Sequence, residues 1–220
     1  ELLTDHLRHL WYALAIFPDT FDRAGAAAVW DMAEEMVAQD VLSELLRYSL
    51  VEYDRGTERY RLHDLTRAYA RARLGDRQME EAALRHASHY AGVWRRVTEE
   101  IQYTSRTSPA GLSRLDREMA NIEAGQAWAA GHVHTPGEAG DRAARLCCAY
   151  AGEMRLTGPH CGSRLGGRLE TAHYLAWCEV GLQAARRVGD RSAQANCLGL
   201  IGSMVGVSAP DVARRYLEQA

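Results

Sequence analysis

The sequence predicts a mainly α-helical protein with one small β-hairpin near its start, and three observations support this. Apolar residues recur at helical spacings of three and four through residues 7–46. Two short alternating segments then flank a glycine-containing loop at residues 50–62, which predicts a β-hairpin. From Gln78 onward we find only helical spacing. Three helices followed by a hairpin is the order of a winged helix, so we assign residues 1–76 to that fold.

Four helices are expected in this first part, at residues 7–17, 24–32, 36–46 and 63–74. Pro18 ends the first helix, because proline cannot continue a helical hydrogen-bond ladder. Asp22 is expected to cap the second helix, since its carboxylate can accept a backbone N–H of the first turn. Gly75 and Asp76 end the fourth helix and begin the next one.

The second part is expected to be helical throughout. Residues 77–134 predict a helical linker or first helical pairs, and residues 135–220 predict antiparallel helical repeats that are truncated at their end. The expected repeat helices lie at residues 138–156, 169–188, 192–205 and 211–220. Gly189 provides a helix stop, Asp190 an N-cap, and Gly202 a small residue where helices approach. This pattern resembles a tetratricopeptide repeat, whose period is about 34 residues.

Composition excludes several chemistries. All 26 basic residues are arginine, so a P-loop lysine or a Schiff-base lysine is absent from this sequence. No apolar run approaches the roughly 18 to 20 residues that span a bilayer. The chain begins at Glu1 and ends inside a predicted helix. We therefore expect a soluble, cytoplasmic, non-catalytic fragment of a longer protein, without a membrane partner.

The cysteines are expected to be reduced and buried. They number five, an odd count without a secretory signal, and are Cys147, Cys148, Cys161, Cys178 and Cys197. The alternative is a zinc site that combines His160 and Cys161 with the first two cysteines. Because no C-x-x-C spacing is present, we expect small apolar side chains and no metal.

The charge distribution opposes DNA binding. Residues 1–76 hold nine arginines against fourteen acidic residues, whereas DNA binding needs the opposite sign. The predicted third helix carries Glu34, Glu35, Asp40 and Glu44 against Arg47. Residues 77–220 are nearly balanced, which favours recognition of a protein. We expect a structural winged helix; a transcription regulator whose winged helix contacts DNA is the alternative.

Four stretches resemble NB-ARC regulators of the STAND class of signalling ATPases. They are Leu62-His63-Asp64-Leu65-x-Arg67-x-Tyr69-Ala70 after the hairpin, the opening Leu10 to Pro18, Glu118-x-x-Asn121-Ile122 with Trp128-Ala129, and Arg186 to Arg191. The chain is most similar to bacterial, especially actinobacterial, members with tetratricopeptide sensors, among them antibiotic-regulatory transcription factors. It departs from the family at Leu62, where methionine is preferred, and at Gly125-Gln126, where Ala-Leu is preferred.

The resemblance implies a nucleotide-dependent switch in the parent protein. ADP, or ATP with Mg²⁺, would be bound by a nucleotide-binding domain of the same parent chain, on which the winged helix closes. His63 would correspond to the histidine that reaches the β-phosphate of ADP, while the fragment itself would hold no cofactor. The alternative is that His63 caps the helix or hydrogen-bonds the hairpin. The repeats would sense a protein ligand or effector.

Aromatic and arginine side chains are the candidate anchors for that partner, because such residues dominate binding energy at interfaces. The candidates are Trp94, Arg95, Tyr103, Trp128, Tyr150, Tyr174 and Trp177, with Arg96 beside them. Aromatic residues at helical spacing also fill helix cores, which is the competing interpretation.

Overall fold

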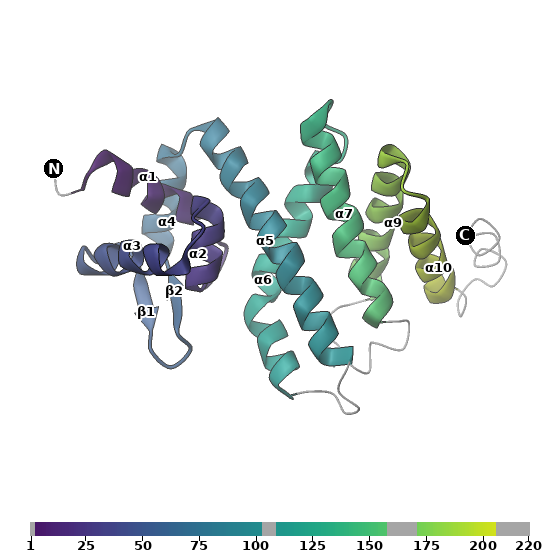
Figure 1. Cartoon of the computed structure of the whole chain (residues 1–220), viewed down its shortest axis with the longest axis horizontal. Helices are drawn as coiled ribbons and strands as arrows, with labels where there is room; N and C mark the ends of the chain where they lie inside the picture. Colours follow the sequence, from purple (N-terminus) through teal and green to yellow (C-terminus); the bar gives the residue numbers. More distant parts are fainter. Residues whose placement is uncertain (1–2, 103–108, 158–170, 206–220) are drawn as a thin grey trace. The chain divides into compact units, whose positions relative to one another are not determined.

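The computed structural model of the 220-residue chain describes residues 3–102, 109–157 and 171–205 (Figure 1). The chain divides into two compact units. Unit 1 combines Glu1–Tyr90 with Arg117–Gly125, and unit 2 combines Ala91–Asp116 with Gln126–Ala220. The helix expected at 211–220 lies outside the described residues, as do Tyr103, His160 and Cys161.

Unit 1 opens with three helices, as the sequence predicts: α1 (Asp5–Ala13), α2 (Arg23–Trp30) and α3 (Glu35–Arg47). The Thr4 hydroxyl caps α1 by accepting a backbone N–H of the first turn. A short 3-10 helix, η1 (Leu14–Ile16), continues α1. The predicted cap of α2 is confirmed, because the Asp22 carboxylate accepts the backbone N–H of Gly25 at 2.8 Å.

The predicted hairpin is present as two antiparallel strands, β1 (Glu52–Asp54) and β2 (Arg59–Arg61). The Asp54 carboxylate closes the loop by accepting the backbone N–H of Gly56 and the hydroxyl of Thr57. These two donors lower the pKa of Asp54. The three helices and the hairpin form a winged helix, and α4 (Asp64–Arg73) follows it.

The core of unit 1 joins the helices to the hairpin. Its fully buried side chains include Leu14, Phe17, Phe21, Leu42 and Leu45. Phe17 stacks on Phe21 with ring centroids 4.3 Å apart. Phe21 in turn exchanges two backbone hydrogen bonds with Tyr60 of β2. The segment between η1 and α2 therefore holds the hairpin against the helices.

Unit 1 extends past the boundary expected at residue 76. The first part of α5 (Asp76–Gln102) and the middle of α6 (Pro109–His132) belong to it. Tyr90 of α5 and Ile122 of α6 are fully buried, and the Tyr90 ring meets Phe17 edge-on at 6.3 Å. Parts of α5 and α6, within the residues expected as a helical linker or first helical pairs, thus pack into the core of unit 1.

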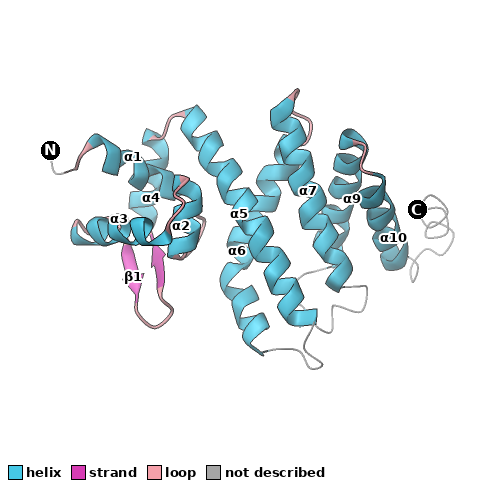
Figure 2. Ribbon diagram, in the orientation of Figure 1, coloured by secondary structure: helices cyan, strands magenta, loops and turns pink. Residues whose placement is uncertain are grey.

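All the secondary-structure elements of unit 2 in the described residues are helices, and the described segments between them are short turns (Figure 2). It contains the remainder of α5 and α6, followed by α7 (Glu138–Thr157), α9 (Thr171–Val188) and α10 (Arg191–Val205). The predicted break before α10 is confirmed: Gly189 has a φ of 72°, and the Asp190 carboxylate accepts the N–H of Ala193 at 2.9 Å. Among the described helices, none has the length and apolar character needed to cross a bilayer.

Gly181 of α9 sets how closely α7, α9 and α10 approach one another. A Cβ atom at this position would lie 2.4 Å from the Cβ of Ala151 in α7 and 3.2 Å from the Sγ of Cys197 in α10. Glycine fits this close approach because it has no side chain. The sequence pattern pointed to Gly202, which is also buried, and gave no indication of Gly181.

Candidate functional site

His63 lies exposed at the N-terminal cap of α4. Its Nδ1 accepts a hydrogen bond from the backbone N–H of Leu65 at 3.3 Å. A neutral imidazole that accepts through Nδ1 carries its proton on Nε2, which is then a donor. Capping the helix and donating to an anion are therefore compatible roles for this one side chain.

Apolar side chains follow His63 along α4. Leu65 is 76% exposed and Tyr69 is 47% exposed. The Tyr69 ring stacks on Trp11 of α1 at 5.9 Å, and the Arg73 guanidinium lies 4.7 Å from its centroid, within cation–π distance. We call His63, Leu65 and Tyr69 the α4 surface. Large apolar side chains in water at a helix start suit contact with another domain.

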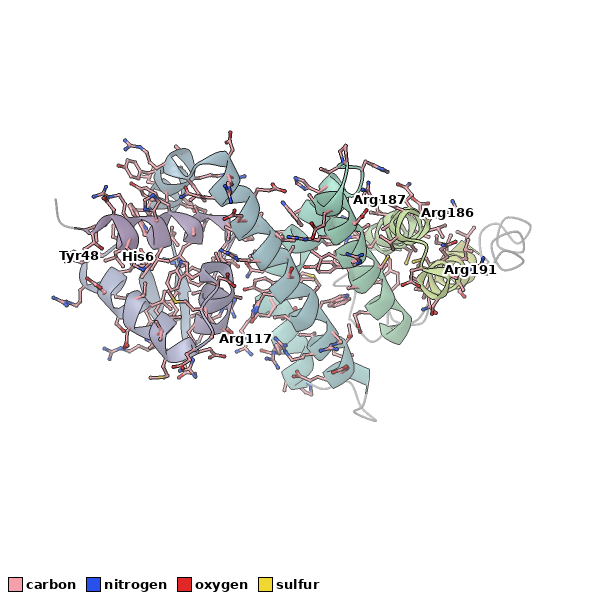
Figure 3. All side chains as sticks on the ribbon, turned by 45° about the horizontal axis from the view of Figure 1, so that its top comes forward. His6, Tyr48, Arg117, Arg186, Arg187 and Arg191 are labelled. Atoms are coloured by element: carbon pink, nitrogen blue, oxygen red, sulfur yellow. The ribbon has the colours of Figure 1, made fainter. Side chains whose placement is uncertain are left out.

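A second surface on unit 1 is acidic. The α3 surface consists of Glu34, Glu35, Met36, Val37, Asp40 and Glu44, all of them exposed. Arg47 in the last turn is the basic residue of this helix, and the exposed Tyr48 follows it (Figure 3). In a winged helix that reads DNA, this helix enters the major groove. Four carboxylates there would meet DNA phosphates with repulsion.

Two arginines of the hairpin are held by carboxylates. Arg59 is only 6% exposed, and its guanidinium donates to both carboxylate oxygens of Glu118 in α6, at 2.5 and 3.0 Å. Arg61 donates through Nε to Glu52 of β1 at 2.5 Å. A buried guanidinium bound to both oxygens of a carboxylate is not available to a phosphate.

A network of buried polar groups continues from Arg59. Its guanidinium also donates to the Thr20 hydroxyl and to the Thr20 carbonyl, each at 2.8 Å. Asn121 of α6 donates to the same carbonyl at 2.8 Å, and its Oδ1 lies 3.3 Å from His86 Nε2 of α5. The network therefore connects β2, the segment before α2, α5 and α6 inside unit 1.

Two further titratable groups are buried in the core of unit 1, and burial keeps both uncharged at neutral pH. Burial lowers the pKa of His86 to about 4, so its neutral ring donates from Nε2 to Asn121. Burial also raises the pKa of Tyr90 well above its usual value, and the Glu118 carboxylate adds to that shift. Arg59 and Glu118 are thus the charged pair at the centre of the network.

Four of the seven candidate partner anchors lie in the core of unit 2. Trp94, Tyr150, Tyr174 and Trp177 are each at most 7% exposed. The Trp94 and Trp177 rings meet edge to face at 6.1 Å, and the Trp94 indole N–H donates to the Tyr150 carbonyl at 3.2 Å. These rings pack helix against helix, which corrects the expectation that they face a partner.

The remaining candidates differ in accessibility. Arg95 is exposed on α5, and so is its neighbour Arg96. Trp128 is half-buried and stacks on His132 at 4.6 Å. Tyr103 lies outside the described residues. Arg95 is therefore the predicted anchor that the structure leaves most open to a partner.

The junction motif near the end of α9 holds a turn of unit 2 together. Arg187, labelled in Figure 3, lies near the end of α9. It donates to the Asp141 carboxylate at 3.0 Å and to the Val133 and Gly137 carbonyls at 2.9 and 3.3 Å. Its neighbour Arg186 is exposed. Arg187 therefore joins α9 to the turn between α6 and α7, and acts in packing.

The structure describes four of the cysteines, three of them buried and one half-buried. Cys147, Cys178 and Cys197 are buried, as expected, and burial raises the pKa of each thiol to about 12. Burial also raises the pKa of the half-buried Cys148, to about 11. Protonated thiols are poor nucleophiles and poor metal ligands. Within residues 3–102, 109–157 and 171–205, no group of three His, Cys, Asp or Glu residues is arranged to hold a metal.

Comparison with known families supports the first part of the fold. Residues 3–75 match a family of winged helix-turn-helix domains, a span that runs from α1 through α4. The chain thus contains a winged helix-turn-helix domain, followed by a helical region. A search of curated proteins and of solved structures gives no match.

Sequence reasoning missed the buried network. Glu118 and Asn121 were singled out only as part of a linker motif, although their spacing of three places both on one face of a helix. Arg59 was not singled out at all. A partial signal was present, because Glu118 and Asn121 share a helix face with the apolar Leu115 and Ile122.

Proposed function

We propose that this chain is the regulatory and protein-interaction portion of a STAND-class NB-ARC signalling protein. In this scheme the winged helix closes on a nucleotide-binding domain of the parent chain, and the helical region senses a ligand or partner. ADP or ATP with Mg²⁺ belongs to the nucleotide-binding domain, and this chain performs no chemistry itself. The four stretches of family resemblance and the winged-helix match at residues 3–75 support the proposal.

The observation that carries the proposal is the α4 surface. His63 presents an imidazole donor at the start of a helix, where the helix dipole favours an anion such as the β-phosphate of ADP. Exposed Leu65 and Tyr69 provide apolar contact area on the same helix. Phosphate contact and domain contact would thus come from one element.

The alternative is a transcription regulator whose winged helix contacts DNA, and the family match is compatible with it. The charges argue against it. The α3 surface carries four carboxylates, and Arg59 and Arg61 of the hairpin are already bound by Glu118 and Glu52. A phosphate backbone would therefore find repulsion where DNA-binding winged helices need attraction.

We further propose that α7, α9 and α10 are tetratricopeptide-like repeats that serve as the sensor. The close approach at Gly181 supports this, since small residues at helix contacts are typical of such repeats. Of the candidate anchors, Arg95 is the one that we retain for contact with a partner.

ADP retention by the purified parent protein tests the function of His63. A charge-assisted hydrogen bond contributes about 1.5–3 kcal/mol, so His63→Ala should weaken ADP by roughly 10- to 150-fold and favour the signalling state. His63→Asn is the matched variant, because asparagine keeps a helix cap and removes the imidazole. It should lose ADP as His63→Ala does. If both variants retained ADP at the wild-type level, His63 would have no function in ADP binding and would serve only as the helix cap.

A further inference from the structure

We propose that the α3 surface and the hairpin form a docking site for a basic segment of a partner protein, whose arginine side chain enters a pocket between them. The pocket has a volume of about 400 Å³. It is lined by Asp22, Arg23, Ala24, Glu35, Gln39, Tyr53, Glu58 and Tyr60, all within unit 1. We call it the acidic pocket. The proposal does not depend on a nucleotide-binding domain.

The charges of the acidic pocket favour a cation. It contains three carboxylates and one guanidinium, and that guanidinium, Arg23, is already bound by Glu35 at 2.9 Å. Asp22 caps α2 with one of its oxygens. Glu58 is exposed and forms no ion pair with any residue that the structure describes. Glu58 is therefore the carboxylate most available to an incoming guanidinium.

Two tyrosines supply the second part of a cation site. The Tyr53 ring is 37% exposed and lies 4.7 Å from the Tyr60 ring. The Gln39 side-chain amide donates from Nε2 to the Tyr60 hydroxyl at 2.8 Å. This hydrogen bond fixes the Tyr60 ring, against which Tyr53 packs. A guanidinium stacks on an aromatic face through cation–π attraction while it binds a carboxylate. Arginine fits this combination better than lysine.

The surroundings of the pocket indicate that the arginine belongs to a protein segment. Met36 is 63% exposed and Val37 is 47% exposed, directly after the pocket residue Glu35. An apolar residue of the partner would cover them. Glu34, Asp40 and Glu44 extend the negative charge along α3 and match further basic residues. Charge complementarity thus favours a basic protein segment that also carries apolar residues, and disfavours a nucleic acid as the partner.

Fluorescence anisotropy of a labelled leucine–arginine peptide, titrated with this chain, tests the proposal. The control peptide carries citrulline in place of arginine, which keeps the shape and removes the charge. We expect saturable binding of the arginine peptide, weaker at about 200 mM than at about 50 mM salt, because charges drive it. The citrulline peptide should bind at least about tenfold more weakly, a difference of about 1.4 kcal/mol.

Variants locate the binding on the pocket. Tyr53→Ala combined with Glu58→Gln should weaken the arginine peptide by at least about tenfold, since both partners of the guanidinium are removed. Glu81→Gln changes the same charge on α5, outside the pocket, and should leave affinity unaltered. Circular dichroism checks that both variants stay folded, as expected for exposed positions.

Three results would overturn the proposal. Equal affinity for the arginine and citrulline peptides would show that the positive charge does not contribute to binding. An unchanged affinity of the folded Tyr53→Ala and Glu58→Gln variant would show that the peptide does not bind in the acidic pocket. Sedimentation that detects a dimer of the wild type, lost in this variant, would assign the surface to a second copy of the chain.

Discussion

Removal of the Glu118 carboxylate should destabilise unit 1 strongly. In Glu118→Leu the Arg59 guanidinium stays in the interior, with only the Thr20 hydroxyl and carbonyl as acceptors among its described hydrogen bonds. Breaking a buried ion pair by removing one partner costs about 3–5 kcal/mol. For a unit of this size, a loss of 3 kcal/mol lowers the melting temperature by roughly 12–24 °C. Urea unfolding followed by circular dichroism measures the loss, and amide hydrogen exchange in β2 locates it in unit 1.

Two further variants separate the ion pair from other causes. Glu118→Gln keeps the shape and one acceptor, so it should lose only about 1.5–3 kcal/mol and stay folded. Arg59→Met combined with Glu118→Leu should recover most of the stability, because apolar replacement of a whole buried pair is often neutral. Glu123→Gln, an exposed carboxylate on the same helix, is the control and should change stability by less than about 0.5 kcal/mol. If Glu118→Gln behaved like Glu123→Gln, or if the double variant were no more stable than Glu118→Leu, the ion pair would not hold unit 1.

Three other predictions concern the fold. His86 has a pKa of about 4 in the folded chain and near 6.5 in the unfolded chain, so the free energy of unfolding should fall by about 3 kcal/mol as the pH drops from 6.5 to 4. His86→Gln should make the urea midpoint less dependent on pH over this range. Gly181→Val should lower the free energy of unfolding by about 1–3 kcal/mol, because its side chain would overpack the contact between helices. Gly199→Ala has open space around its Cβ and should be neutral or stabilising by up to about 1 kcal/mol. Equal melting temperatures for the two variants would contradict the close approach at Gly181. In the isolated chain, His63→Ala should lose about 0.5–2 kcal/mol of cap energy and His63→Asn much less, and equal unfolding midpoints would argue against the cap.

Local signals predicted the elements of this chain well. Asp22 and Asp190 were expected to cap helices, and each accepts a backbone N–H three residues ahead. Gly189 was expected to end a helix and has the positive φ that suits glycine. Such features depend on neighbours within one turn, so the sequence contains all the information that they need.

Contacts between distant residues could not be predicted in the same way. Alternation along β2 places Arg59 and Arg61 on one face of the strand, yet the first is buried and the second exposed. The difference comes from Glu118, which is 59 positions away from Arg59 in the sequence. Helical spacing likewise places Trp94 on the apolar face of its helix, but spacing alone cannot tell whether that face packs in the core or contacts a partner.

The winged helix is proposed to serve protein contacts and not DNA, and a duplex titration tests this proposal most directly. Fluorescence anisotropy of a labelled duplex at about 50 mM salt should show no saturable binding at about 1 µM chain, because the α3 surface repels phosphates. A variant with Glu34→Lys, Asp40→Lys and Glu44→Lys is the positive control and should gain salt-sensitive binding. Sub-micromolar binding by the wild-type chain, weakened by rising salt, would contradict the account and favour the transcription-regulator alternative.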